Sequence, residues 1–116
     1  MNVIAQKSKA FAVRIVRLCR HMQTNDNEYV LSKQLLRSGT SIGVNVYEAT
    51  QAFTHADFSH KMSIALKESV ETEYWLELLY EAGFLAEQGF QSIYQDNKEL
   101  TRLLTAILNT AKKNSK

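Results

Sequence analysis

Apolar residues recur at helical spacing along most of the chain and divide it into segments that alternate with short polar breaks. The segments cover residues 2–22, 28–53, 55–82 and 90–111. Where the apolar positions of a segment fall on one side of a helix, they predict its core face. In the first two segments the expected core residues are Ile4, Phe11, Ile15, Leu18, Met22, Leu31, Leu35, Ile42, Val46, Ala49 and Phe53.

The third segment is apolar almost all round. One side carries Phe58, Met62, Ala65, Leu76 and Tyr80, and the other carries Ile64, Trp75, Leu78 and Ala82 with Glu68 and Glu71 among them. A helix with two apolar faces needs two surfaces to pack against, so we expect the bundle core on one side and a neighbouring subunit on the other. Trp75 is then a core or interface anchor, the alternative being a platform for base stacking. The fourth segment offers the apolar set Ile93, Tyr94, Leu100, Leu103, Leu104, Ile107 and Leu108.

Turn and capping residues separate the segments. Residues 24–27 are dense in turn formers, Thr54 with Asp57 resembles a capping box, and Gly83 is expected at the position after a helix end. Connections this short force antiparallel neighbours. The chain has no proline, which opposes a fold with many hairpins. We therefore predict one all-α domain over residues 1–116, an antiparallel up-down-up-down four-helix bundle.

The stretch from Ser38 to Glu48 is unusual for a helix interior because it contains two glycines. Each glycine costs a helix about 1 kcal/mol relative to alanine. Plotted on a helix, the stretch has an apolar stripe, a smooth flank and a polar ladder. The ladder predicts either hydrogen bonds or a cation across a helix interface, or a recognition site that reaches solvent. We assign the stretch first to packing or assembly, through Ser38, Gly39, Ser41, Gly43, Asn45 and Glu48.

Charge is segregated along the chain although its net value is only +2. Residues 1–45 carry +5, residues 46–97 carry −7 and residues 98–116 carry +4. Two interpretations follow. The charged helix faces pair with one another across the bundle, or they form a dipolar surface whose basic end meets an anionic partner.

Catalytic chemistry finds little support in the sequence. Asp57-x-x-His60 is a single weak analogue of a di-iron motif, which needs two copies, and helix capping explains Asp57 better. Cys19 is the only cysteine, so neither an intramolecular disulfide nor a cysteine zinc site can form. No nucleophile elbow or phosphate-binding loop occurs. We expect no enzyme activity, no metal and no cofactor. No apolar run has membrane-spanning length, and the cytoplasm is the expected compartment.

Basic residues offer a stronger indication of nucleic-acid binding. In an up-down bundle the first helix begins where the last one ends, so Lys7 and Lys9 are expected to approach Lys112, Lys113 and Lys116. Arg14, Arg17 and Arg20 extend this patch along the first helix. Clustered Lys and Arg are what phosphate contacts require.

Three motifs resemble one family of small bacterial proteins. The first is Gln34-Leu35-x-Arg37-Ser38-x-x-Ser41-Ile42-x-x-Asn45-x-x-Glu48. The others are Asp57-Phe58-x-x-Lys61 and Lys67-Glu68-x-x-Glu71-x-x-Tyr74-Trp75-Leu76. Over nearly its whole length the chain resembles the four-helix-bundle proteins encoded in intervening sequences of bacterial large-subunit rRNA genes, which are related to the accessory variability protein of diversity-generating retroelements.

That resemblance implies a homopentameric, barrel-like ring of bundles and a basic surface that binds nucleic acid. This chain departs from a strongly basic relative, because residues 46–97 are acidic, and the departure weakens the nucleic-acid inference. Ala49 follows Glu48 where many members are expected to have glycine. The leading hypothesis is a non-enzymatic, self-assembling bundle that binds structured RNA or another nucleic acid. The alternative is an oligomeric adaptor that docks a partner protein and does not contact nucleic acid.

Overall fold

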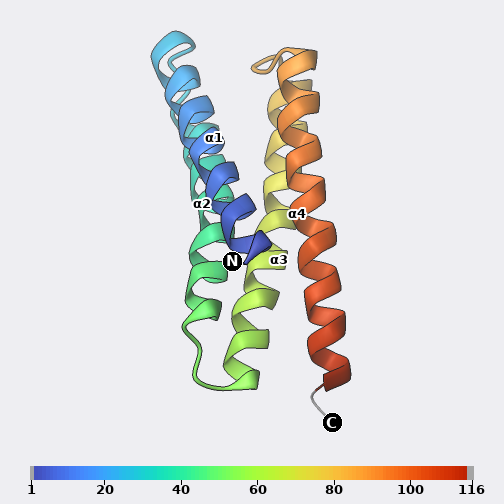
Figure 1. The fold of residues 1–116 in the computed structure, drawn as a ribbon. Coiled ribbons are helices and arrows are strands. Elements are labelled where there is room, and N and C mark those ends of the chain that lie inside the picture. Colours follow the sequence, from blue (N-terminus) through green and yellow to red (C-terminus); the bar gives the residue numbers. More distant parts are fainter. Residues whose placement is uncertain (1, 115–116) are drawn as a thin grey trace.

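Four antiparallel α helices form the molecule, seen in a computed structural model that describes residues 2–114 (Figure 1). The helices are α1 (Val3–Asn25), α2 (Val30–Thr50), α3 (His55–Glu81) and α4 (Glu87–Asn114). Each helix packs against two neighbours, in the pairs α1–α2, α2–α3, α3–α4 and α1–α4. The bundle measures 50 × 23 × 20 Å. The predicted all-α four-helix bundle is confirmed.

Local capping chemistry sets the helix ends. The Asn2 side chain accepts a hydrogen bond from the Ile4 amide at 3.1 Å, and the Thr54 hydroxyl accepts one from the Asp57 amide at 3.0 Å. Gly83 has a φ of +91°, the left-handed region that glycine adopts without strain. The Gly83 and Phe84 amides donate back to carbonyls of the last turn of α3, which closes the helix as predicted.

The predicted apolar stripes form most of the observed core. The buried apolar residues are Ile4, Phe11, Ile15, Cys19, Met22, Leu35, Ile42, Val46, Ala49, Met62, Ala65, Leu76, Leu79, Phe90, Ile93, Leu100, Leu104 and Ala111. The prediction for Phe53 was wrong. Helix α2 ends at Thr50, so Phe53 lies in the turn before α3, and its side chain is fully exposed.

Helix α4 begins earlier than the apolar pattern predicts. It starts at Glu87, so Gly89 lies in its first turn and not in the preceding connection. At the other end α4 continues to Asn114. The predicted basic residue Lys116 lies outside the described residues.

A layer of small polar side chains crosses the core between α2, α3 and α4. Ser38, Ser69, Thr72 and Asn97 are fully buried. The Thr72 hydroxyl donates to Ser38 Oγ at 3.0 Å, and Asn97 Nδ2 donates to the Ser69 carbonyl at 2.9 Å. Buried polar groups need partners, so this layer favours one lateral arrangement of the three helices. Periodicity gave no signal for Ser69, Thr72 or Asn97.

Candidate functional site

The smooth flank of the Ser38–Glu48 stretch faces α1. A Cβ placed on Gly39 would lie 2.9 Å from two carbon atoms of Ile15, and one placed on Gly43 would lie 3.4 Å from the Ser8 carbonyl oxygen. The two glycines therefore let the backbone of α2 approach α1 closely. At Gly39 even a methyl group would be obstructed.

The polar ladder of the same stretch faces α3 or bonds to its own helix. Ser38 receives the hydrogen bond from Thr72, and Glu48 pairs with Lys61 at 2.9 Å. Ser41 Oγ and Asn45 Nδ2 both donate to carbonyls one turn earlier, at 2.6 and 2.9 Å. These polar atoms have partners within the bundle, which is the arrangement expected of a packing element.

A charged cluster links α2 to α3 at the second face of α3. The Arg37 guanidinium contacts Glu68 at 3.3 Å and also hydrogen bonds Glu71. The Trp75 indole Nε1 donates to Glu71 at 2.9 Å. That indole bond, together with Arg37, lowers the pKa of Glu71. Trp75 is half-buried and packs against the core, so Glu68, Glu71 and Trp75 have partners within one chain.

Further ion pairs join neighbouring helices and compensate some of the carboxylates of the acidic segment. Lys98 pairs with Glu73 at 2.9 Å, and Lys61 pairs with Glu48. The side-chain hydrogen bonds to these carboxylates raise the pKa of both lysines. Part of the charge segregated along the sequence is therefore paired between adjacent helices, as the first of the two interpretations above expects.

The predicted basic patch is divided into two separate surfaces, which corrects the expected juxtaposition. Lys7 pairs with Glu99 at 3.2 Å, so the start of α1 lies beside the middle of α4. Lys112 follows Glu99 by thirteen residues, which is about 20 Å along a helix. His55 Nε2 lies 3.0 Å from the Ala111 carbonyl oxygen, which places Lys112 and the neighbouring Lys113 near the start of α3. Figure 1 shows the same offset between the start of α1 and the end of α4.

The exposed face of α1 carries a cluster of basic residues that make no ion pair within residues 2–114. We call this face the α1 stripe; it consists of Lys9, Val13, Val16, Arg17 and Arg20. Within residues 2–114 its three cations make no ion pair, whereas Arg14 is held by Asp96 at 2.5 Å and by Ser92 at 3.0 Å. The stripe thus combines uncompensated positive charge with exposed apolar surface.

An apolar groove runs between α1 and α2 beside the α1 stripe. Its volume is about 350 Å³, and it is lined by Ala5, Lys9, Ala12, Thr40, Gly43, Val44, Tyr47 and Glu48. The side chains of Val44 and Tyr47 are 53% and 67% exposed, which is high for large hydrophobic residues. Gly43 deepens the groove because it lacks a side chain. The smooth flank predicted from the sequence is therefore also part of the outer surface.

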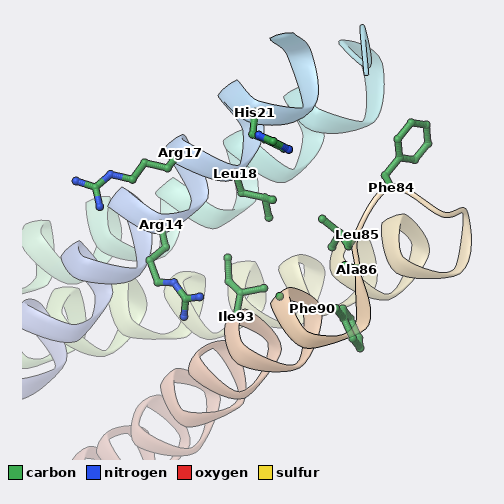
Figure 2. A pocket seen from close by; sticks show the side chains of 10 residues that line it. Arg14, Arg17, Leu18, His21, Phe84, Leu85, Ala86, Phe90 and Ile93 are labelled. Atoms are coloured by element: carbon green, nitrogen blue, oxygen red, sulfur yellow. The ribbon is translucent and has the colours of Figure 1, made fainter. Parts of the chain in front are cut away.

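A second cleft opens between α1 and the start of α4 (Figures 1 and 2). At this end of the bundle the α1–α2 hairpin and the α3–α4 hairpin diverge. Its volume is about 340 Å³, and it is lined by Arg14, Arg17, Leu18, His21, Phe84, Leu85, Ala86, Gly89, Phe90 and Ile93. Figure 2 shows Arg14 reaching from α1 toward α4 and Leu18, Leu85 and Ile93 pointing into the cleft. The sequence indicated Arg14 and Arg17 as site residues but gave no indication of Phe84, Leu85 or Gly89.

Groups that could support other chemistry are dispersed or inert. In the described part of the chain, no three His, Cys, Asp or Glu side chains are grouped so that they could hold a metal ion. Burial raises the pKa of the Cys19 thiol to about 12, which suppresses its reactivity. None of the helices described is long and apolar enough to cross a membrane.

Comparison with known proteins finds a family model and a crystal structure that are similar to this chain. Residues 1–106 match the family model described as 23S rRNA-intervening sequence protein. A crystal structure of a protein of unknown function from the S23 ribosomal protein family of Bacteroides thetaiotaomicron is 50% identical, with a TM-score of 0.90. The match covers 91% of this chain and 98% of that one. No curated protein matches the chain. The chain therefore belongs to the 23S rRNA-intervening sequence protein family, as its helix motifs indicate.

Proposed function

We propose that this protein is a non-enzymatic, self-assembling helical bundle of the cytoplasm that binds structured RNA through the α1 stripe. The observation that carries the proposal is which charged side chains have ion-pair partners within the bundle and which do not. The carboxylates of Glu48, Glu68, Glu71 and Glu73 pair with cations inside the bundle, whereas Arg17 and Arg20 make no ion pair within residues 2–114. Uncompensated, clustered arginines attract phosphate groups.

Gel-shift titration of a structured RNA hairpin over a range of salt concentrations tests the proposal. Each phosphate contact contributes a slope of about −0.9 to the plot of log K against log salt concentration. The Arg17→Glu/Arg20→Glu variant is expected to weaken binding at least tenfold and to flatten that slope by about 2. Lys67→Glu/Arg102→Glu is the matched control, because it makes the same change in net charge at exposed positions on α3 and α4.

Three results would overturn the RNA-binding proposal. They are no binding at low salt, binding without a salt slope, and equal loss of affinity in the control variant. Pull-down with and without nuclease separates RNA binding from the adaptor alternative. A protein partner that is retained after nuclease treatment would favour the adaptor.

We further propose that the protein assembles into a homopentameric ring. A cyclic ring with more than two subunits uses two different faces of each subunit. The chain offers two exposed apolar faces, one at the groove with Val44 and Tyr47 and one on α3 with Val70 and Tyr74. Exposed apolar patches of this kind, surrounded by polar residues, often mark contacts between proteins.

Light scattering at micromolar concentration tests the ring. Both Val44→Lys/Tyr47→Lys and Val70→Lys/Tyr74→Lys should dissociate it, because each alters one of the two faces. Phe53→Lys is the control, since Phe53 is exposed in the turn between α2 and α3 and lies on neither face. A parent protein that is a 13.2 kDa monomer would contradict the assembly. Dissociation by only one of the two variants would contradict a ring.

A further inference from the structure

The cleft between α1 and the start of α4 combines positive charge with an apolar interior. Its cationic side chains, Arg14 and Arg17, come from α1, as does His21. Its remaining lining residues are apolar, and no Asp or Glu lines it. The ligand that fits such a cleft has an anionic group at one end and a flat or apolar body at the other.

The two arginines differ in how firmly they are held. Arg14 Nη1 donates to Asp96 and Nη2 donates to Ser92, so the Arg14 guanidinium is oriented toward α4 with N–H groups to spare. Arg17 makes no ion pair within the described residues and stands at the rim that the cleft shares with the α1 stripe. Figure 2 shows the Arg14 side chain reaching toward α4 and the Arg17 side chain extending away from it, so a phosphate group in the cleft would meet the oriented Arg14 guanidinium.

The apolar wall suits a nucleobase. Leu18 and Ile93 point into the cleft from α1 and α4, and Leu85 points into it from the connection before α4 (Figure 2). His21 stands at its loop end, whereas the Phe84 ring is directed away from the cleft. Unpaired bases of RNA stack on aromatic and histidine side chains and pack against apolar ones. A volume of about 340 Å³ is in the range that encloses a small organic ligand.

Gly89 keeps the cleft open. It lies in the first turn of α4 and lines the cleft, and a Cβ placed on it meets no atom within 4 Å. A Cβ at this position is therefore free of clashes, and we expect a larger side chain there to narrow the cleft. Gly89 also gives the means to block the cleft while leaving every charge of the protein unchanged.

We infer that this cleft binds one unpaired nucleotide of an RNA loop, with its phosphate at Arg14 and its base against Leu18, Leu85 and Ile93. The inference rests on the proposed RNA binding and deepens it. The α1 stripe holds the phosphates of a structured RNA, and the adjoining cleft accepts a base that is splayed out of the helix. Binding would then prefer RNAs with unpaired nucleotides over continuous duplexes.

Two RNAs distinguish binding in the cleft from non-specific electrostatic attraction between RNA and basic side chains. One is a hairpin with a single-stranded loop, and the other is a blunt duplex of equal charge. The parent is expected to bind the loop RNA at least tenfold more tightly. Gly89→Phe should abolish that preference and leave duplex binding unchanged. Gln91→Phe introduces the same side chain at an exposed position of α4 that does not line the cleft, and it should retain the preference.

Nuclear magnetic resonance titration with adenosine 5′-monophosphate locates the site directly. Amide shifts are expected at Leu18, Leu85 and Gly89, and Gly89→Phe should remove them. Octanoate supplies an anion and an apolar chain without a base, so it should bind more weakly than the nucleotide.

The inferred nucleotide site would be overturned if the parent and Gly89→Phe showed the same preference for the loop RNA. It would also be overturned if octanoate bound as tightly as adenosine 5′-monophosphate. If Gly89→Phe retains the preference while Arg17→Glu/Arg20→Glu loses affinity, the cleft fails and the proposed function stands. If the nucleotide shifts the cleft amides but structured RNA shows no salt slope, the proposed function fails and the nucleotide site stands.

Discussion

Replacing Gly39 with alanine places a methyl group against Ile15 where α1 and α2 cross. The added carbon would lie 2.9 Å from two Ile15 carbon atoms and 3.1 Å from a third. Ile15 is fully buried, and as a β-branched residue in a helix it has one strongly preferred χ1 rotamer. Because Ile15 cannot turn aside, α1 and α2 must move apart.

The magnitude follows from a comparison with Gly43→Ala on the same helix. Removing a glycine from a helix interior stabilises it by about 1 kcal/mol, and both variants receive this gain. At Gly43 the nearest atom is the Ser8 carbonyl oxygen at 3.4 Å, a tolerable contact. Overpacking of a core costs about 1–3 kcal/mol. Gly39→Ala should therefore be less stable than Gly43→Ala by about 1–3 kcal/mol, the helix-propensity gain being common to both.

Urea denaturation followed by circular dichroism measures this difference. Protein concentration must be held constant, because assembly would make stability depend on it. The double variant Ile15→Ala/Gly39→Ala should be more stable than the sum of the single effects by about 0.5–3 kcal/mol, since the new methyl group then occupies vacated space. Equal stability of Gly39→Ala and Gly43→Ala would refute the reasoning. Additive effects in the double variant would refute the assigned contact with Ile15.

Three further predictions concern local features of the bundle. Thr54→Ala removes the cap on the Asp57 amide and should lower the free energy of unfolding in urea by about 1 kcal/mol; Thr50→Ala, at the end of α2, is the control and should have a smaller effect. The buried Cys19 thiol should resist iodoacetamide at pH 8 until urea unfolds the chain, and rapid labelling of the native protein would contradict its burial. Because burial raises the Cys19 pKa from 9.0 to about 12, its contribution to stability is complete below pH 9 and is lost as pH rises toward 12. That loss is about 1.4 kcal/mol per pH unit at most, and the stability difference between the parent and Cys19→Ala between pH 8 and 10 measures it.

Local sequence was sufficient to predict the helices and several of their ends. Thr54 and Gly83 act within a few residues of their own position, so their roles at the ends of α3 can be recognised without the fold. The core stripes are similarly local, because a helix carries its apolar face wherever it packs. The prediction failed at Phe53 because helical periodicity does not extend past the end of α2 at Thr50.

The relative positions of the helices were decided only by tertiary structure. Side-chain packing between distant segments sets how far one helix is shifted along another, and no periodicity encodes that shift. The shift places Lys7 beside Glu99 and so separates it from Lys112, which divides the predicted basic patch.

Both flanks of the Ser38–Glu48 stretch could be recognised from spacing, but their partners could not. Packing directs Gly39 toward Ile15 in α1 and Ser38 toward Thr72 in α3. The cleft is the clearest case of a feature that only the fold creates. Phe84 and Gly89 join Arg14 there because the two hairpins diverge, a property of how four helices pack that none of them carries in its own sequence.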